Sequence, residues 1–163
     1  METAILVAQI CSTASLAAWL TTGVRDNIFK PMLNETYTAE VLSMARMRDE
    51  YPEAFAEVAH RAITDRKLQR VAFYLVVSVE LLATILLWIG TIALLMALVG
   101  TAELDTARSL ALYGTTAFCA VWAGMLIVGN YFNYWFGHEG AQNTHFQLTL
   151  WGLGTAILIV TGG

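Results

Sequence analysis

The chain has 163 residues, enough for one domain, with a hydrophobic fraction of 57% and a charged fraction of only 13%. Soluble domains carry about 25% charged residues, so this composition argues against an ordinary soluble protein. The formal net charge of −4 comes without a basic patch, and we expect no nucleic-acid partner.

Four long apolar runs predict four membrane-spanning helices. A bilayer core of about 30 Å needs roughly 20 residues of helix. Residues 3–24 and 109–137 carry no charge, residues 71–102 carry only Glu80, and the uncharged run 146–163 is at the lower length limit. We therefore expect an all-α integral membrane fold in a single domain, residues 1–163, with spans at about 3–24, 71–100, 109–136 and 146–161.

The first run differs from a signal peptide, because it contains Glu2 and no Lys or Arg before position 25. We expect it to be retained as a span. Four spans place both termini on one side of the membrane, and the 46-residue segment 25–70 and the short loop 138–145 on the other.

Segment 25–70 holds eight of the nine Lys and Arg residues and eight of the thirteen acids. It is expected to form a partly helical cap. Thr38 suits the start of one short helix, and Pro52 with Glu53 suits the first turn of another. Because Lys and Arg favour the cytoplasm, the basic residues that flank the first two spans place this segment there.

Glu80 is the most distinctive single residue, because an ionised, unpaired carboxylate inside a span costs several kcal/mol. Thr84, Trp88 and Thr91 follow it at helical spacing and form a polar stripe. Two interpretations remain open. Glu80 is either a proton or cation relay, or a residue that hydrogen-bonds a neighbouring helix and sets its register.

Residues 129–146 are rich in aromatic and amide side chains. Tyr131, Tyr134 and Trp135 fall where the third span reaches the headgroups, as expected of an interfacial aromatic belt. Asn130 and Asn133 suit lipid less well and are predicted to point into the bundle or toward segment 25–70.

Metal and cofactor sites have little support in the sequence. His138 and His145 are weak candidates for metal ligands, together with His60 and Glu139, but their spacing fits no metal motif. A transmembrane haem would need histidines within the spans, and the predicted spans contain none. The two cysteines, Cys11 and Cys119, lie in different apolar runs. The sequence contains no nucleophile motif, phosphate loop or paired carboxylates. We expect no cofactor and no enzymatic activity.

Small residues predict close helix packing. They recur on one face of the first, third and fourth spans: Ala8, Cys11, Ser15, Ala18 and Thr22; Thr116, Ala120 and Gly124; Gly152 and Ala156.

Several short motifs resemble a family of small prokaryotic integral membrane proteins, domain of unknown function 2165. The motifs are Asn27-Ile28, Asn34 and Val41-Leu42-Ser43-Met44, Arg61-Ala62-Ile63, Glu80 with Trp88-Ile89-Gly90, and Trp122, Gly129, Trp135, Gly140, Gln142 and Phe146. The resemblance covers most of the chain and implies a multi-pass protein of the inner (plasma) membrane of a prokaryote. It also implies that Asn27, Asn34, Glu80 and the 129–146 stretch form one polar cluster at one mouth of the bundle.

The chain departs from the family pattern at the end of the third span. Residues 129–133 read Gly-Asn-Tyr-Phe-Asn, where the pattern has Gly-Gly-Glu-Trp-Phe, so the acid of the family is missing. The family's basic residues lie near its N-terminus and in the second loop, which would place segment 25–70 in the periplasm. This opposes the charge count, and the orientation stays open.

Two function classes remain. The first is a non-catalytic accessory or scaffold subunit of a larger membrane complex, with a membrane-protein partner or a second copy of the chain and the lipid bilayer as its surroundings. The alternative is a small transporter or channel that uses Glu80 as an intramembrane relay.

Overall fold

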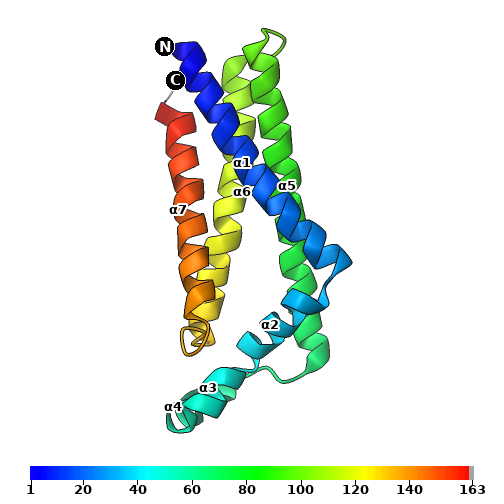
Figure 1. Cartoon of the computed structure of the whole chain (residues 1–163), viewed down its shortest axis with the longest axis vertical. Coiled ribbons are helices and arrows are strands. Elements are labelled where there is room, and N and C mark those ends of the chain that lie inside the picture. The colour runs from blue at the N-terminus through cyan, green and yellow to red at the C-terminus, as the bar shows by residue number, and fades with distance from the viewer. Residues whose placement is uncertain (162–163) are drawn as a thin grey trace.

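The computed structural model describes residues 1–161, which are almost entirely helical (Figure 1). Four helices in this range are long and apolar enough to cross a membrane: α1 (Glu2–Phe29), α5 (Arg66–Leu98), α6 (Leu104–Tyr131) and α7 (Glu139–Thr161). The predicted all-α fold with four spanning helices is therefore confirmed. The start of α1 and the end of α7 lie at the same end of the bundle (Figure 1).

Two of the spanning helices begin at a carboxylate cap. The side chain of Asp65 accepts hydrogen bonds from the backbone N–H groups of Lys67 and Leu68 at the start of α5. Glu103 does the same for Asp105 and Thr106 at the start of α6. These carboxylates satisfy free amides and favour the positive helix end, so both helices begin in polar sequence before the apolar run.

The third span ends earlier than predicted, at Tyr131 and not at position 136. The backbone N–H of Tyr134 bonds back to the carbonyl of Gly129, and Asn133 adopts a left-handed conformation with φ of 51°. Asparagine tolerates this conformation better than most residues, so the chain turns here although its composition stays apolar.

Segment 25–70 contributes the last turn of α1 and then a cap of short helices. These are α2 (Met32–Leu42), α3 (Ala45–Glu50), α4 (Pro52–Val58) and the 3₁₀ turn η1 (Ala59–Arg61). Pro52 opens α4, as predicted. The expected helix start at Thr38 is wrong, because α2 begins just after Pro31 and passes through position 38. The cap lies at the end of the bundle away from the start of α1 (Figure 1).

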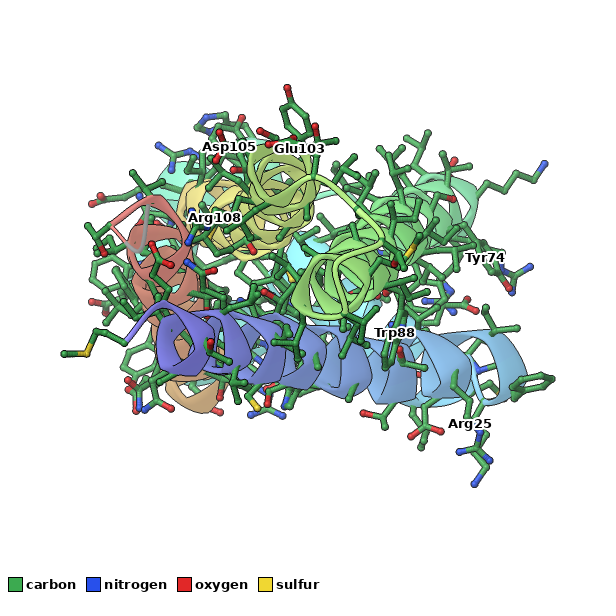
Figure 2. All side chains as sticks on the ribbon, turned by 90° about the horizontal axis from the view of Figure 1, so that it is seen from above. Arg25, Tyr74, Trp88, Glu103, Asp105 and Arg108 are labelled. Atoms are coloured by element: carbon green, nitrogen blue, oxygen red, sulfur yellow. The ribbon has the colours of Figure 1, made fainter. Side chains whose placement is uncertain are left out.

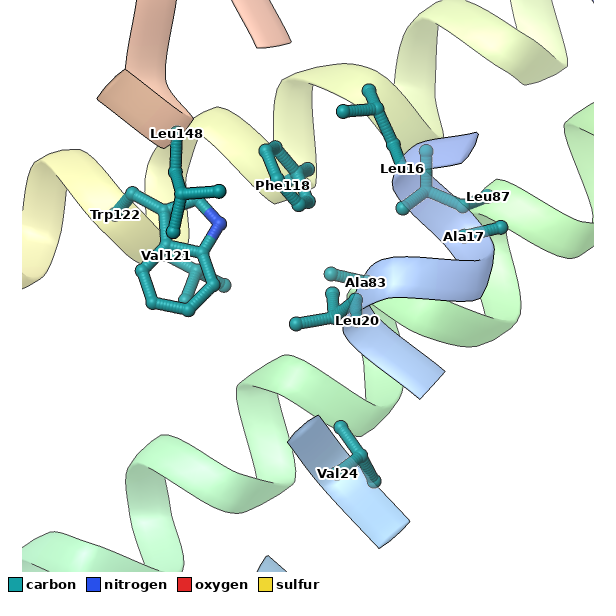
Figure 3. Close-up of a cluster of buried hydrophobic side chains, with 10 residues drawn as sticks. All are labelled: Leu16, Ala17, Leu20, Val24, Ala83, Leu87, Phe118, Val121, Trp122 and Leu148. Atoms are coloured by element: carbon teal, nitrogen blue, oxygen red, sulfur yellow. The ribbon is translucent and has the colours of Figure 1, made fainter. Parts of the chain in front are cut away.

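The membrane bundle is held by two apolar clusters. The central one joins all four spanning helices (Figure 3): Leu16, Ala17, Leu20, Val24, Ala83, Leu87, Phe118, Val121, Trp122 and Leu148. The second lies toward the start of α1 and the end of α7: Leu6, Ile10, Leu94, Ala107, Ala111 and Ile159. A third cluster, in which Phe132 meets the buried cap residues Leu42, Met44 and Met47, fixes the cap on the end of α6.

A buried polar residue also ties helices together far from the cap. Gln9 is completely buried, and its side-chain amide donates to the carbonyl of Leu158 at 3.1 Å. The Nε of Arg108 lies 3.4 Å from the Gln9 side-chain oxygen. Figure 2 shows Arg108 on the side of α6 toward α7. Gln9 therefore links α1, α6 and α7.

Small residues make close helix contacts, but only in part at the positions that the sequence predicted. Gly90 of α5 packs against the backbone of Ala111, and Gly114 of α6 against the backbone of Leu87. Gly152 packs on α6, as expected of a small-residue face. The predicted faces of α1 and α6 are wrong as internal contacts, because Ala8, Cys11, Ser15, Ala18, Thr22, Thr116 and Ala120 are exposed and Gly124 has open space beside it.

Gly114→Ala should destabilise the protein by about 1–3 kcal/mol, because the added Cβ overpacks a rigid contact. It would lie 2.7 Å from the backbone nitrogen of Leu87. Gly124→Ala is the matched control in the same helix, and it should gain up to about 1 kcal/mol from helix propensity. Thermal unfolding in detergent measures both. A Gly114→Ala protein as stable as wild type would contradict the close approach of α5 and α6.

Candidate functional site

The carboxyl group of Glu80 lies at the junction of α1, α2 and α5. Helical spacing places Glu80 on the buried face of α5 with Val77 and Ala83, and only 4% of it is exposed. Asn27, in the last turn of α1, donates from Nδ2 to Oε2 of Glu80 at 2.8 Å. A membrane carboxyl without a partner is costly, so this bond fixes where α1 meets α5.

The hydrogen bonding continues from Asn27 to the cap. Asn34 of α2 donates from Nδ2 to Oδ1 of Asn27 at 2.6 Å. Asn34 is exposed, so a chain of two hydrogen bonds leads from the buried carboxyl to the cap surface. The structure thus brings together Asn27, Asn34 and Glu80, three of the residues expected in one cluster.

The predicted polar stripe below Glu80 does not extend this network. The hydroxyl of Thr84 donates to the backbone carbonyl of Glu80, and that of Thr91 to the carbonyl of Leu87. Trp88 donates from Nε1 to Oγ1 of Thr21 on α1 at 3.0 Å. Each group is satisfied locally or across the α1–α5 contact, so these residues form no row of groups leading along α5 from the carboxyl.

A second carboxylate at this junction, Glu35, was not among the residues expected from the sequence. It neighbours Asn34 on α2, and its Oε1 lies 3.0 Å from Nη2 of Arg66 and 3.2 Å from Nε of Arg70. The available signal was an acid in the cap sequence and a basic cluster at 66–70. Pattern alone did not show that they meet. The two ion pairs tie α2 to the first turns of α5.

Asn130 and Asn133 do not join the network, which corrects the prediction for both. Asn130 is exposed at the end of α6, and its backbone carbonyl accepts from the N–H of Asn133. The Oδ1 of Asn133 accepts from Nε1 of Trp135 at 3.3 Å. Because α6 ends at Tyr131, these side chains serve the turn that follows it and do not reach the Glu80 junction.

The aromatic belt is present only in part. Tyr131 is 53% exposed and Trp135 47% exposed, as expected at an interface. Tyr134 is only 4% exposed, which is contrary to the prediction. Its ring folds over Gly129, where a Cβ would lie 2.7 Å from the ring, so the turn directs this tyrosine inward.

The cap and the 129–146 stretch do meet, through arginines. Arg46 donates from Nη1 to the carbonyl of Gly137 at 2.7 Å. Arg61 donates from Nη1 to the carbonyl of Tyr131 at 3.2 Å, and its guanidinium lies 5.2 Å from the centre of the Tyr131 ring. These arginines satisfy carbonyls that the end of α6 and the following turn leave free. They attach the cap to the segment that follows α6.

The histidines are separated from one another. His60 is exposed in η1, His138 is buried with its ring 4.7 Å from that of Tyr37, and His145 lies within α7, not in the predicted loop. The His145 ring is stacked 6.1 Å from that of Tyr134. No group of three His, Cys, Asp or Glu residues that could hold a metal ion occurs within residues 1–161.

Burial and the nearby Arg46 guanidinium lower the pKa of His138, and Glu40 and Glu50 partly oppose this. Neither imidazole nitrogen has a hydrogen-bond partner in the described part of the chain. Burial also raises the pKa of the Tyr134 hydroxyl. His138 is therefore suited to a neutral packing role beside Tyr37.

Two chemical roles are open to the Glu80 junction. The carboxyl can act as a hydrogen-bond acceptor that locks α1 and α2 onto α5. A membrane carboxyl can also take up and release a proton, with the amides of Asn27 and Asn34 between it and the surface. The geometry fits both roles, and they differ in whether Glu80 must change its protonation state.

Comparison with known proteins agrees with this architecture. The model of a family described as a predicted small integral membrane protein, domain of unknown function 2165, matches residues 5–161. No curated protein and no solved structure matches the chain.

Asn27→Ala should destabilise the protein by about 1–2 kcal/mol, because it leaves both Glu80 and Asn34 without their partner. Hydrogen–deuterium exchange should rise most in α2. Asn143→Ala, at an exposed position of α7, is the matched control and should leave exchange in α2 unchanged. Equal exchange in the two variants would contradict a role for Asn27 in holding the cap.

The cap should lose stability as the pH falls below about 6.5, the ordinary pKa of histidine. Because the pKa of folded His138 is lowered, the unfolded chain takes up a proton first. The stabilisation is therefore complete above the unfolded pKa and is lost as pH falls through the folded pKa. Amide exchange in α2 and α3 at about pH 7.5 and pH 5.5 measures this. His138→Phe should remove this pH-dependent rise in exchange, and His60→Gln should keep it. If His138→Phe keeps the rise and His60→Gln removes it, His138 is not the group that causes it.

Proposed function

The chain belongs to the small integral membrane protein family domain of unknown function 2165, and from this premise we propose that it is a non-catalytic accessory or scaffold subunit of a larger membrane complex. We place it in the inner (plasma) membrane of a prokaryote as a multi-pass protein with both termini on one side. The position of the start of α1 and the end of α7 at one end of the bundle supports the shared side (Figure 1).

The observation that carries this proposal is the outward face of α1. Ala8, Cys11, Ser15, Ala18 and Thr22 recur every three or four residues, and all of them are exposed. The opposite face of α1 is buried in the core of the bundle. Within residues 1–161, the small residues are therefore left uncovered.

The outward face of α7 has the opposite character. Phe146, Leu150, Leu153, Ile157 and Val160 recur at the same spacing and are also exposed, but they are bulky. Bulky apolar side chains suit contact with lipid chains, whereas small ones let a second helix backbone come close. The contrast within one molecule favours lipid beside α7 and a partner helix beside α1.

The hydroxyl groups on the small face of α1 are already satisfied. Ser15 donates to the carbonyl of Cys11 at 2.8 Å, and Thr22 to the carbonyl of Trp19 at 2.7 Å. A partner helix can therefore pack on this face without supplying hydrogen bonds to these hydroxyls. Tight packing of small residues is a recognised way for membrane helices to associate.

Purification from native membranes in a mild detergent, followed by mass measurement of the intact complex, tests this proposal. We expect a stoichiometric second protein that the Ser15→Leu/Ala18→Leu variant loses, because leucine fills the space that a partner backbone would occupy.

Gly154→Leu is the control, since position 154 is exposed on α7 and a Cβ added there meets nothing within 4 Å. This variant should keep the partner. A lone monomer, or an assembly of this chain only, would overturn the accessory role.

A second candidate is a small transporter or channel with Glu80 as its relay. The hydrogen-bonded chain from buried Glu80 through Asn27 to exposed Asn34 favours it. A relay requires proton exchange at the carboxyl, so Glu80→Gln should abolish proton flux in reconstituted vesicles while the cap stays folded. Under the accessory role, the same variant should change neither flux nor the mass of the complex.

A further inference from the structure

The outer face of α5 carries a hollow of about 590 Å³ along its first four turns. Lys67, Arg70, Val71, Tyr74 and Leu75 line it, and their spacing of three and four residues places them on one helix face. We propose that this hollow binds an anionic phospholipid, with the lipid phosphate at Lys67 and Arg70 and one acyl chain along Val71 and Leu75.

The basic end of the hollow has free hydrogen-bond donors. Glu35 engages Arg70 only through Nε, at 3.2 Å, and in residues 1–161 the two terminal nitrogens of this guanidinium have no protein partner. The ammonium group of Lys67 forms no ion pair in the same range. Lys67 and Arg70 are three residues apart on the same face, so both can reach one phosphate.

The surrounding charges favour an anion held by side chains. Three cations, Arg66, Lys67 and Arg70, face two carboxylates, Glu35 and Asp65, which leaves a net positive charge. Asp65 already accepts from the first free backbone amides of α5. The helix terminus is therefore occupied, and the phosphate contact falls to Lys67 and Arg70.

The apolar end of the hollow points to a lipid and not to a free phosphate. Val71 is 65% exposed and Leu75 is 64% exposed. They lie about one and two helical turns after Lys67, at the start of the apolar run of α5. Tyr74 lies between them on the side of α5 away from α6 and α7 (Figure 2). Tyrosine is typical of the border between headgroups and acyl chains, so Tyr74 places this part of α5 at that border, with the basic residues on its polar side.

Native mass spectrometry of the delipidated full-length protein tests this proposal. The protein is titrated with phosphatidylglycerol or with phosphatidylcholine of the same acyl chains. Phosphatidylglycerol should bind roughly tenfold more tightly, because each basic residue near an anionic headgroup contributes a several-fold preference. Lys67→Gln/Arg70→Gln should remove this preference.

Arg25→Gln/Lys30→Gln is the matched control. It removes the same charge at the end of the bundle that carries the cap, from exposed residues outside the hollow, and it should keep the preference. If the double variant at 67 and 70 fails to fold, Lys67→Gln alone serves, since its side chain makes no ion pair within residues 1–161. It should lose several-fold in affinity.

Four results would overturn the proposal. Equal binding of the two lipids would remove the charge preference. Equal loss in the control variant would make the effect one of overall charge. Displacement of phosphatidylglycerol by equimolar glycerol phosphate would show a phosphate site without a lipid contact. Leu75→Ser should weaken phosphatidylglycerol binding, and unchanged binding would also count against the acyl contact.

Discussion

The hydrogen bond from Asn27 to Glu80 sets the geometry on which the cap depends. A carboxyl inside a bilayer has no water to bond with, so it needs a donor from another part of the protein. Asn27 supplies this donor only if α1 extends beyond its apolar run and crosses α5 near position 80. Because of this crossing, α1 ends beside the N-terminal part of α5, and α2 begins directly after α1. Asn34 and Glu35 of α2 can then reach Asn27, Arg66 and Arg70.

Each further contact of the cap follows from this placement. Once α2 lies against α5, the chain returns over the end of α6, where Arg46 and Arg61 bind free carbonyls and Phe132 enters the cap core. This end of the bundle therefore carries a folded element with its own apolar cluster. Individual membrane hydrogen bonds contribute only about 1 kcal/mol, so the cap depends on their combination with this apolar packing.

The surface of the bundle is uneven in a way that bears on function. The small face of α1 suits another helix, the bulky face of α7 suits lipid chains, and the basic hollow of α5 suits an anionic headgroup. These faces point in different directions, because each helix buries the opposite side of itself in the shared core. A partner on α1 and a lipid on α5 can therefore be present together.

The sequence by itself determined the four spans, the all-α class and the helix start at Pro52, and it singled out Glu80 as an acid that needs a partner; Asn27 and Asn34 were indicated only by the resemblance to the family. Span length and composition are local properties, and an acid in an apolar run needs a partner wherever it lies. Only the tertiary structure decided that Glu35 meets Arg66 and Arg70, that Tyr134 turns inward, and that Gly90 and Gly114 make the close helix contacts. These depend on the rotation and crossing of whole helices, and on the left-handed turn at Asn133, which apolar composition does not reveal. The small faces of α1 and α6 failed as internal contacts for the same reason: small size permits close packing, but the rotation of the helix decides which partner meets that face.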